Sequence, residues 1–157
     1  MPMPHGKGHK MTILMAEDDP DDRVLTREAL ESAHVTNELR TVNDGRELLD
    51  YLRREGDYAG SNADAPMPGI ILLDLNMPRM DGREALAEIK SDSELRHIPI
   101  VVLTTSKAEE DIVRTYNLGV NSFITKPVTF TGLVEVMQTW SRYWFEIVDL
   151  PPEVDDR

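Results

Sequence analysis

Five short apolar runs alternate along the chain with longer stretches of mixed polar and apolar residues. The most continuous run, Gly69-Ile70-Ile71-Leu72-Leu73, ends at Asp74. Apolar runs without polar alternation are typical of strands that are buried on both faces, as in parallel sheets. The pattern predicts five strands, at residues 12–16, 38–42, 69–73, 98–103 and 121–125.

Helix-start signals mark the stretches between these runs. Asp19-Pro20 gives an N-cap followed by proline at the first helical position, which predicts a helix to about Ala33. Ser106-Lys107-Ala108-Glu109 has the capping-box pattern and predicts another helix start. Further helices are expected at about residues 46–54, 82–90 and 129–148, and residues 55–69, with their Gly, Asn, Ser, Asp and two Pro, are expected to be a loop.

The regular alternation of five strands with five helices is typical of βα repeats joined by right-handed crossovers. We therefore expect an α/β fold, a three-layer doubly wound (βα)5 sandwich around a parallel five-stranded sheet. A closed eight-stranded barrel would need about 250 residues, more than the 157 of this chain. We expect one domain over residues 11–148, with a flexible N-terminal arm at 1–10 and a tail at 149–157.

The formal net charge is −12, from 17 Lys and Arg against 29 Asp and Glu. A surface this acidic repels phosphate backbones and no basic stripe interrupts it, so we expect no direct binding to nucleic acid. No apolar run approaches the roughly 20 residues that span a membrane, so we expect no membrane contact. Cysteine is absent, which excludes a disulfide framework and a thiolate nucleophile and fits the cytoplasmic location that we expect.

Polar side chains follow the predicted strands at the edge where parallel sheets carry their functional residues. They are Glu17, Asp18 and Asp19 after the first strand, Asp74 after the third, Thr104 after the fourth and Lys126 after the fifth. Carboxylates that are forced together repel, and a hard divalent cation such as Mg²⁺ relieves that cost. The sequence therefore predicts a Mg²⁺ site at this edge of the sheet.

These groups match the needs of phosphoryl transfer to an aspartate. A carboxylate such as Asp74 can attack phosphorus and form an acyl phosphate. Mg²⁺ and the ammonium of Lys126 would supply positive charge to the phosphoryl oxygens, and Thr104 could donate a hydrogen bond to one of them.

Taken one at a time, these residues also have plainer interpretations. Asp18 and Asp19 before Pro20 could form only a helix N-cap, Lys126 could be a surface lysine, and Thr104 a strand-end hydroxyl. Their joint placement at successive strand ends favours a functional site.

Three segments resemble the motifs of response-regulator receiver domains. Asp74-Leu75-Asn76-Met77-Pro78-Arg79-Met80-Asp81-Gly82 is similar to the family's phosphorylation loop, Leu14-Met15-Ala16-Glu17-Asp18-Asp19-Pro20 to its acidic-pair segment, and Ser122-Phe123-Ile124-Thr125-Lys126-Pro127 to its lysine–proline segment. Asp74 precedes Thr104 by 30 positions and Lys126 by 52, which agrees with the family spacing. The resemblance covers about residues 11–140 and implies a flavodoxin-like sheet of strand order 2-1-3-4-5.

The resemblance implies a role for each acidic-site residue. Asp74 is the expected phosphoacceptor. Asp18 and Asp74 are expected to ligate Mg²⁺ through their side chains, Asn76 through its backbone carbonyl, and Glu17 through a water.

The resemblance also implies which residues bind the phosphoryl group and which residues switch conformation. Thr104 and Lys126 are expected to contact the phosphoryl group. Phe123 takes the family's switch-aromatic position and Thr104 is the other expected switch residue, although an ordinary core phenylalanine would fit the place of Phe123. The Lys126–Pro127 bond is commonly cis in the family, and a cis bond before proline costs little enough to allow that.

The last predicted helix is rich in aromatic residues. A stripe at helical spacing forms its expected core face, with Leu133, Val136, Met137, Trp140, Trp144 and Ile147. The apolar surplus on this helix suggests an interface, so we expect a homodimer through Trp140, Tyr143, Trp144 and Phe145. The alternative is that these residues pack under the tail from Asp149 to Arg157.

The aromatic helix and the long 55–69 loop resemble one subfamily, the stand-alone receivers partnered with bacterial and cyanobacterial phytochrome histidine kinases. This narrower resemblance implies a single-domain response regulator of a two-component phosphorelay. It would accept a phosphoryl group on Asp74 from a sensor histidine kinase and signal through altered protein contacts. It would be no enzyme beyond its own phosphoryl transfer and dephosphorylation.

Two other functions fit the same residues less well. An aspartyl-phosphate phosphohydrolase would use Asp74 as a transient nucleophile, but Asn76 stands where a second acid would help such an enzyme. A flavin- or nucleotide-binding domain of the same topology would need a Gly-rich turn after the first strand, and Glu17-Asp18-Asp19 has the opposite charge.

Overall fold

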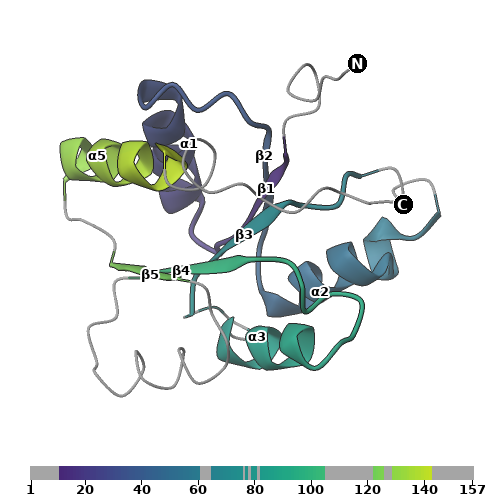
Figure 1. Cartoon of the computed structure of the whole chain (residues 1–157). Helices are drawn as coiled ribbons and strands as arrows, with labels where there is room; N and C mark the ends of the chain where they lie inside the picture. Colours follow the sequence, from purple (N-terminus) through teal and green to yellow (C-terminus); the bar gives the residue numbers. More distant parts are fainter. Residues whose placement is uncertain are drawn as a thin grey trace. The chain divides into compact units, whose positions relative to one another are not determined.

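The computed structural model describes residues 11–60, 65–75, 77, 79–80, 82–104, 122–125 and 129–142. Within them the strands are β1 (Ile13–Ala16), β2 (Leu39–Val42), β3 (Ile70–Leu73), β4 (Ile100–Thr104) and β5 (Ser122–Thr125) (Figure 1). The helices are α1 (Pro20–Ser32), α2 (Gly45–Arg53), the short 3₁₀ helix η1 (Gly56–Tyr58), α3 (Gly82–Lys90) and α5 (Phe130–Ser141).

The five strands form one parallel sheet in the order β2-β1-β3-β4-β5. Ala16 at the end of β1 pairs with Val42 of β2 on one side and with Leu73 of β3 on the other. The carboxyl ends of the three strands therefore lie at one level. The α/β flavodoxin-like fold and the strand order expected from the sequence are confirmed.

The residues group into two compact units. The first comprises residues 1–23 and 37–126, and the second residues 24–36 and 127–157. The first unit contains the whole sheet with α2 and α3, and the second contains α5 and most of α1.

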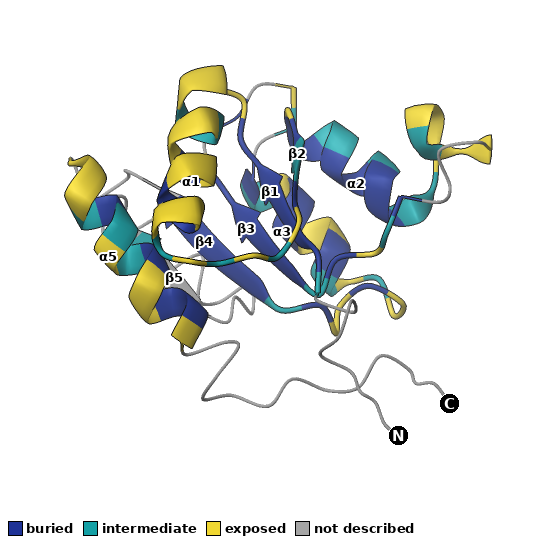
Figure 2. Ribbon diagram, turned by 90° about the horizontal axis from the view of Figure 1, so that it is seen from above, coloured by how far each residue is buried: buried dark blue, intermediate teal, exposed yellow. Residues whose placement is uncertain are grey.

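The core of the first unit lies between the sheet and the helices α2 and α3. Alternate strand residues, among them Leu14 and Ile71, pack with Leu48 of α2 and Leu86 of α3 in this core. The strand residues between them are buried as well, for example Ile13, which is 0 % exposed (Figure 2). Both faces of the central strands are thus buried, as the unbroken apolar runs predicted.

In the second unit, α5 is N-capped by Thr129, whose hydroxyl accepts a hydrogen bond from the Gly132 amide at 3.0 Å. The apolar stripe expected on this helix is partly confirmed, because Leu133, Met137 and Trp140 are buried. Residues 143–145 of the expected dimer interface lie outside the described residues, as do the helix start at Ser106, the arm and the tail. No helix in the described part of the chain is long and apolar enough to cross a bilayer.

The predicted loop at residues 55–69 contains structure that its composition did not reveal. It opens with η1, where Gly56 adopts a φ of 57°. The Tyr58 ring packs against Tyr51 of α2, with ring centroids 4.9 Å apart and planes tilted by 53°. The Tyr51 hydroxyl also donates to the carbonyl of Pro66 at 2.6 Å, so two tyrosines hold this loop against α2.

The observed strand β4 begins later than expected, at Ile100 rather than at residue 98, and it includes Thr104. Proline has no amide hydrogen to donate to a sheet ladder, so Pro99 is poorly suited to a strand interior. Its carbonyl still accepts a hydrogen bond from the Ile71 amide at 3.0 Å. Thr104 is therefore the last residue of the strand and does not follow it.

Candidate metal and phosphoacceptor site

Strand pairing brings Glu17 and Asp74 to the same edge of the sheet. Each follows directly after one of the paired residues Ala16 and Leu73. The Asp74 amide donates to the carbonyl of Ala16 at 3.1 Å, and the Glu17 amide donates to the carbonyl of Val42 at 3.0 Å. Both acidic residues are thus still held by the sheet ladder at the point where their strands end.

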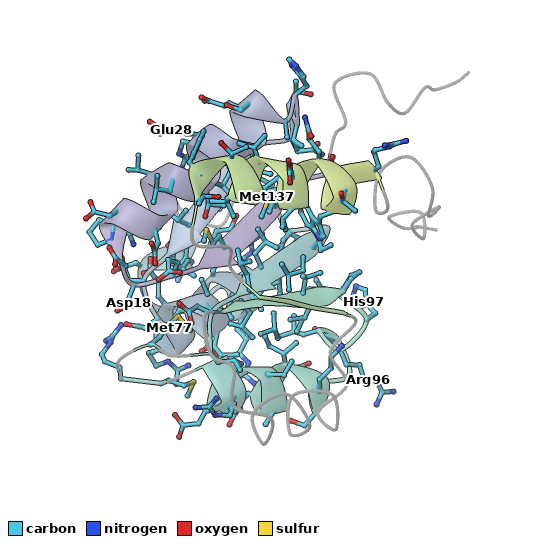
Figure 3. The ribbon with its side chains drawn as sticks, turned by 90° about the vertical axis from the view of Figure 1, so that its left-hand side faces the viewer. Asp18, Glu28, Met77, Arg96, His97 and Met137 are labelled. Atoms are coloured by element: carbon cyan, nitrogen blue, oxygen red, sulfur yellow. The ribbon has the colours of Figure 1, made fainter. Side chains whose placement is uncertain are left out.

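Glu17, Asp18 and Asp74 form a close acidic trio. One carboxylate oxygen of each lies within 4.8 Å of the others. Glu17 is 1 % exposed and Asp74 is 9 % exposed, whereas Asp18 is open to solvent. Figure 3 shows Asp18 at the same end of the first unit as Met77, opposite the end that carries Arg96 and His97.

The donor set of this trio fits a hard divalent cation. Three carboxylates in such proximity repel, and two of them are withdrawn from water that would otherwise screen them. Oxygen ligands from a few carboxylates, with room left for waters on the exposed side, suit Mg²⁺. The acidic trio can therefore hold a divalent metal ion.

Asp19, unlike its neighbour Asp18, caps the start of α1. Its side chain accepts a hydrogen bond from the Asp21 amide at 2.9 Å, which is the N-cap contact expected before Pro20. Its own amide donates to the Glu17 carboxylate at 3.2 Å. The plainer N-cap interpretation thus holds for Asp19, while Asp18 belongs to the acidic trio.

The loop after Asp74 closes tightly on α3. The Gly82 amide donates to the carbonyl of Leu75 at 2.9 Å. A Cβ atom at Gly82 would lie only 2.3 Å from the Asp74 carbonyl oxygen, so only glycine allows this approach. The start of α3 therefore fixes the backbone that carries the Asp74 side chain.

The start of α2 contacts this loop at residues 79 and 80, shortly before Gly82. Asp44 caps α2 by accepting from the Glu47 amide at 2.8 Å, and its second oxygen pairs with Arg79 Nε at 2.6 Å. The Gly45 amide donates to the carbonyl of Met80 at 2.8 Å. Arg79 adopts a left-handed φ of 64° in this arrangement.

The buried Asp44 carboxylate is held in its charged form. Burial alone would raise its pKa, but the hydrogen bonds from Arg79 and from the α2 amides, with the Arg79 charge, outweigh burial. The pKa of Asp44 is lowered below the ordinary 3.8 as a result. Asp44 is thus a charged anchor for the loop at neutral pH.

The remaining predicted site residues are placed only in part. Thr104 ends β4, and its backbone pairs with Thr125 of β5 directly before Lys126. Phe123 is in β5. Asn76, Lys126 and the predicted cis bond to Pro127 lie outside the described residues, so their roles stay predictions.

Three residues around the loop after Asp74 were not predicted from the sequence: Asn43, Asp44 and Arg79. The first two follow β2, and the rule that found Glu17 and Asp74 would have found them if it had been applied to the second strand. The pairing of Arg79 had no comparable signal, because it depends on a left-handed backbone at a residue other than glycine.

A family model described as "Response regulator receiver domain" matches residues 13–138 of this chain. Response regulator Rcp1 of Synechocystis sp. is 42% identical over 139 residues, which cover 88% of this chain and 92% of that protein.

Two solved structures are similar to this chain over nearly all of their own length. The phosphorylated cyanobacterial phytochrome response regulator RcpA is 45% identical with a TM-score of 0.81, and the match covers 90% of this chain and 98% of RcpA. The Mn²⁺-bound form of Rcp1 is 40% identical with a TM-score of 0.81, over 90% of this chain and 99% of that one.

Proposed function

This chain belongs to the family of response regulator receiver domains, which take a phosphoryl group on an aspartate, and on that premise we propose that the acceptor is Asp74. The observation that carries the proposal is the acidic trio at the carboxyl edge of the sheet. Asp74 is its member on β3, and its backbone is fixed on both sides, by Ala16 and by Gly82.

The chemistry of the proposal follows from the position of Asp74. One carboxylate oxygen of Asp74 forms a bond to the phosphorus while the bond from phosphorus to the donor nitrogen breaks, and the electron pair leaves with the donor imidazole. Because the Asp74 backbone is held on both sides, little ordering remains to be done when the donor arrives.

We propose that the metal of this site is Mg²⁺, held by Asp18 and Asp74, with Glu17 acting through a water and Asn76 through its carbonyl. Mg²⁺ supplies positive charge that offsets the repulsion between the carboxylates and the phosphoryl oxygens. Glu17 and Asp18 are adjacent and differ in exposure, so Glu17 supports the buried side of the site and Asp18 its open side. The Mn²⁺-bound form of Rcp1 supports a divalent ion in this family.

We propose that the phosphoryl donor is a sensor histidine kinase of the phytochrome type, and that the exchange takes place in the cytoplasm. The support is the likeness to RcpA, a cyanobacterial phytochrome response regulator, over 90% of this chain. We further propose that the chain catalyses only its own phosphorylation and dephosphorylation. Asn76 in place of a second acid supports an acceptor rather than a phosphohydrolase.

Labelling with acetyl phosphate in the presence of Mg²⁺ tests the proposal. Asp74→Asn should take no phosphate, and Asp18→Asn should lose most of its Mg²⁺ affinity and label slowly. Lys126→Ala should keep some labelling but lose the structural response, since Lys126 senses the phosphoryl charge and does not form the bond.

The matched control is Asp92→Asn, which makes the same chemical change after α3, where Asp92 pairs with Arg53 at 3.5 Å. It should label at the wild-type rate. Phosphate found on Asp19 or Asp81 in place of Asp74, or rapid labelling of Asp18→Asn at limiting Mg²⁺, would show that the site is assigned wrongly.

A further inference from the structure

A chain of hydrogen bonds leads away from the acidic trio toward η1. We call it the Glu47 network; it consists of the Glu17 carbonyl and the side chains of Arg23, Asn43, Glu47 and Tyr58. All of these residues belong to the first unit. None of their side chains is part of the acidic trio except that of Glu17, whose backbone alone takes part in the network.

At its end near the trio, the network holds the peptide group between Glu17 and Asp18. Arg23 Nη1 donates to the carbonyl oxygen of Glu17 at 3.1 Å and also to the side-chain oxygen of Asn43. The amide of Glu17 is already bonded to Val42 on the other side. The peptide unit between Glu17 and Asp18 is therefore oriented by Arg23, and this peptide sets the direction in which both carboxylates leave the backbone.

The middle of the network fixes Asn43. Glu47 Oε1 accepts from both the Asn43 amide at 2.8 Å and the Asn43 Nδ2 atom at 2.9 Å. Because the Nδ2 atom is bound by Glu47, the side-chain oxygen of Asn43 is left to accept from Arg23. Asn43 is thus the link between the first turn of α2 and the helix α1 residue that orients Glu17.

The far end of the network is Tyr58 of η1. Its hydroxyl donates to the second oxygen of Glu47 at 2.6 Å. Burial and the contact with the Glu47 carboxylate raise the pKa of Tyr58, so this hydroxyl stays protonated and remains a donor. The position of the 55–69 loop is thereby tied to Glu47 and, through Asn43 and Arg23, to Glu17.

We propose that the Glu47 network is a positioning device that couples the 55–69 loop to the metal affinity of the acidic trio. Asn43 and Tyr58 are its positioning residues, and neither touches the metal or the phosphoryl group. A partner protein that pulled Tyr58 away from Glu47 would change metal binding, and with it the rate of phosphorylation, without reaching the site. The inference rests on the proposed metal site and adds a regulatory connection to it.

Mg²⁺ titration by calorimetry tests the inference with variants that do not change the charge. Residues that orient metal ligands usually change metal affinity by about 10- to 100-fold, so Asn43→Ala should weaken Mg²⁺ binding by about tenfold. Tyr58→Phe, two links further away because Glu47 lies between Tyr58 and Asn43, should weaken it by about threefold, below that usual range.

Each variant has a matched control in the same unit. Tyr51→Phe removes the hydroxyl that holds the same loop through Pro66, outside the network. Asn37→Ala removes a side-chain amide that donates to the Met11 carbonyl at 2.8 Å. Asn37 precedes β2, whereas Asn43 follows it. Both controls should bind Mg²⁺ as the wild type does, and urea unfolding of all four variants shows whether any loss of binding merely follows a loss of stability.

The double variant tests the route of coupling. If Tyr58 acts through Asn43, Tyr58→Phe should have no further effect on Mg²⁺ affinity in the Asn43→Ala background. A full effect in that background, or Asn43→Ala and Tyr58→Phe affinities equal to those of their controls, would overturn the inference. Retained Mg²⁺ affinity in Asp18→Asn would overturn the metal site itself, so the two failures are distinguishable.

Discussion

Replacing Gly82 with alanine should disturb Asp74, because the added methyl group would crowd the backbone of Asp74. A Cβ atom at position 82 would lie 2.3 Å from the Asp74 carbonyl oxygen, 2.7 Å from the Leu75 Cα atom and 3.0 Å from the Asp74 carbonyl carbon. All three neighbours are backbone atoms, so no side chain can rotate to make room. The backbone after β3 has to move away from α3.

Two effects of this substitution have opposite signs. Alanine favours the helical state over glycine by about 0.8–1 kcal/mol, which would stabilise α3. Forcing an extra methyl group into a filled site costs about 1–3 kcal/mol, and more where only the backbone can yield. We therefore expect Gly82→Ala to lower the free energy of unfolding by about 1–2 kcal/mol in spite of its better helix propensity.

Urea unfolding measures this difference, and acetyl phosphate labelling measures its effect on the acceptor. A misplacement of about 1 Å at a reacting group can cost about 100-fold in rate, so we expect labelling of Gly82→Ala to slow by at least about tenfold. The control is Gly60→Ala, where φ is 64° and no atom lies within 4 Å of the added methyl group. That variant should lose about 1 kcal/mol to backbone strain alone and should label much faster than Gly82→Ala.

A Gly82→Ala protein as stable as the wild type, or more stable, would refute the reasoning. It would mean that helix propensity outweighs the contact and that the loop after Asp74 has room to relax. Normal labelling together with lowered stability would refute only the claim that Gly82 fixes the acceptor.

Two further predictions concern pH and assembly. Asp44→Asn keeps an N-cap acceptor but loses the charge that pairs with Arg79, so it should be less stable than the wild type at pH 7. The folded-state pKa of Asp44 is lowered below 3.8, so this difference in the free energy of unfolding should be complete above pH 3.8 and should close as the pH falls through the folded-state pKa. Urea unfolding at several pH values measures the difference. A difference that widens in acid would contradict the pairing of Asp44 with Arg79. The homodimer expected through the last helix should be at least as tight at moderate salt as at low salt, because two chains of charge −12 repel and salt screens the repulsion. Light scattering across protein concentration should show it weakened in the double variant Tyr143→Ala with Phe145→Ala, and a wild-type protein that stays monomeric at high concentration would exclude it.

The acidic trio could be predicted from the sequence because its position depends on chain topology alone. The residues directly after β1 and β3 of a parallel sheet lie at one edge whatever their side chains do, so Glu17 and Asp74 could be paired across 57 positions of sequence. The helix expected at about residues 82–90 is also observed, as α3 (Gly82–Lys90).

The Glu47 network could not be predicted in this way. Its contacts depend on side-chain rotamers at Arg23, Asn43 and Glu47. Asn43 and Glu47 are four positions apart, but no spacing rule relates either of them to Arg23 or to Tyr58. Tyr58 lies in a segment whose composition indicates a loop, and a loop composition does not reveal which acceptor a tyrosine hydroxyl will find. Only the folded arrangement of α2 and η1 shows that connection.

Hydrogen exchange at the Gly45 amide can report when the phosphorylation loop opens, because this amide donates to the Met80 carbonyl of that loop. This amide can exchange its hydrogen with solvent only when the loop after Asp74 separates from the start of α2, because the bond of 2.8 Å joins those two segments alone. The Asp74 amide, bonded to Ala16 in the sheet, exchanges only when the central strands part. The ratio of the two exchange rates therefore separates local opening of the loop from unfolding of the sheet, and it does so in the unmodified protein.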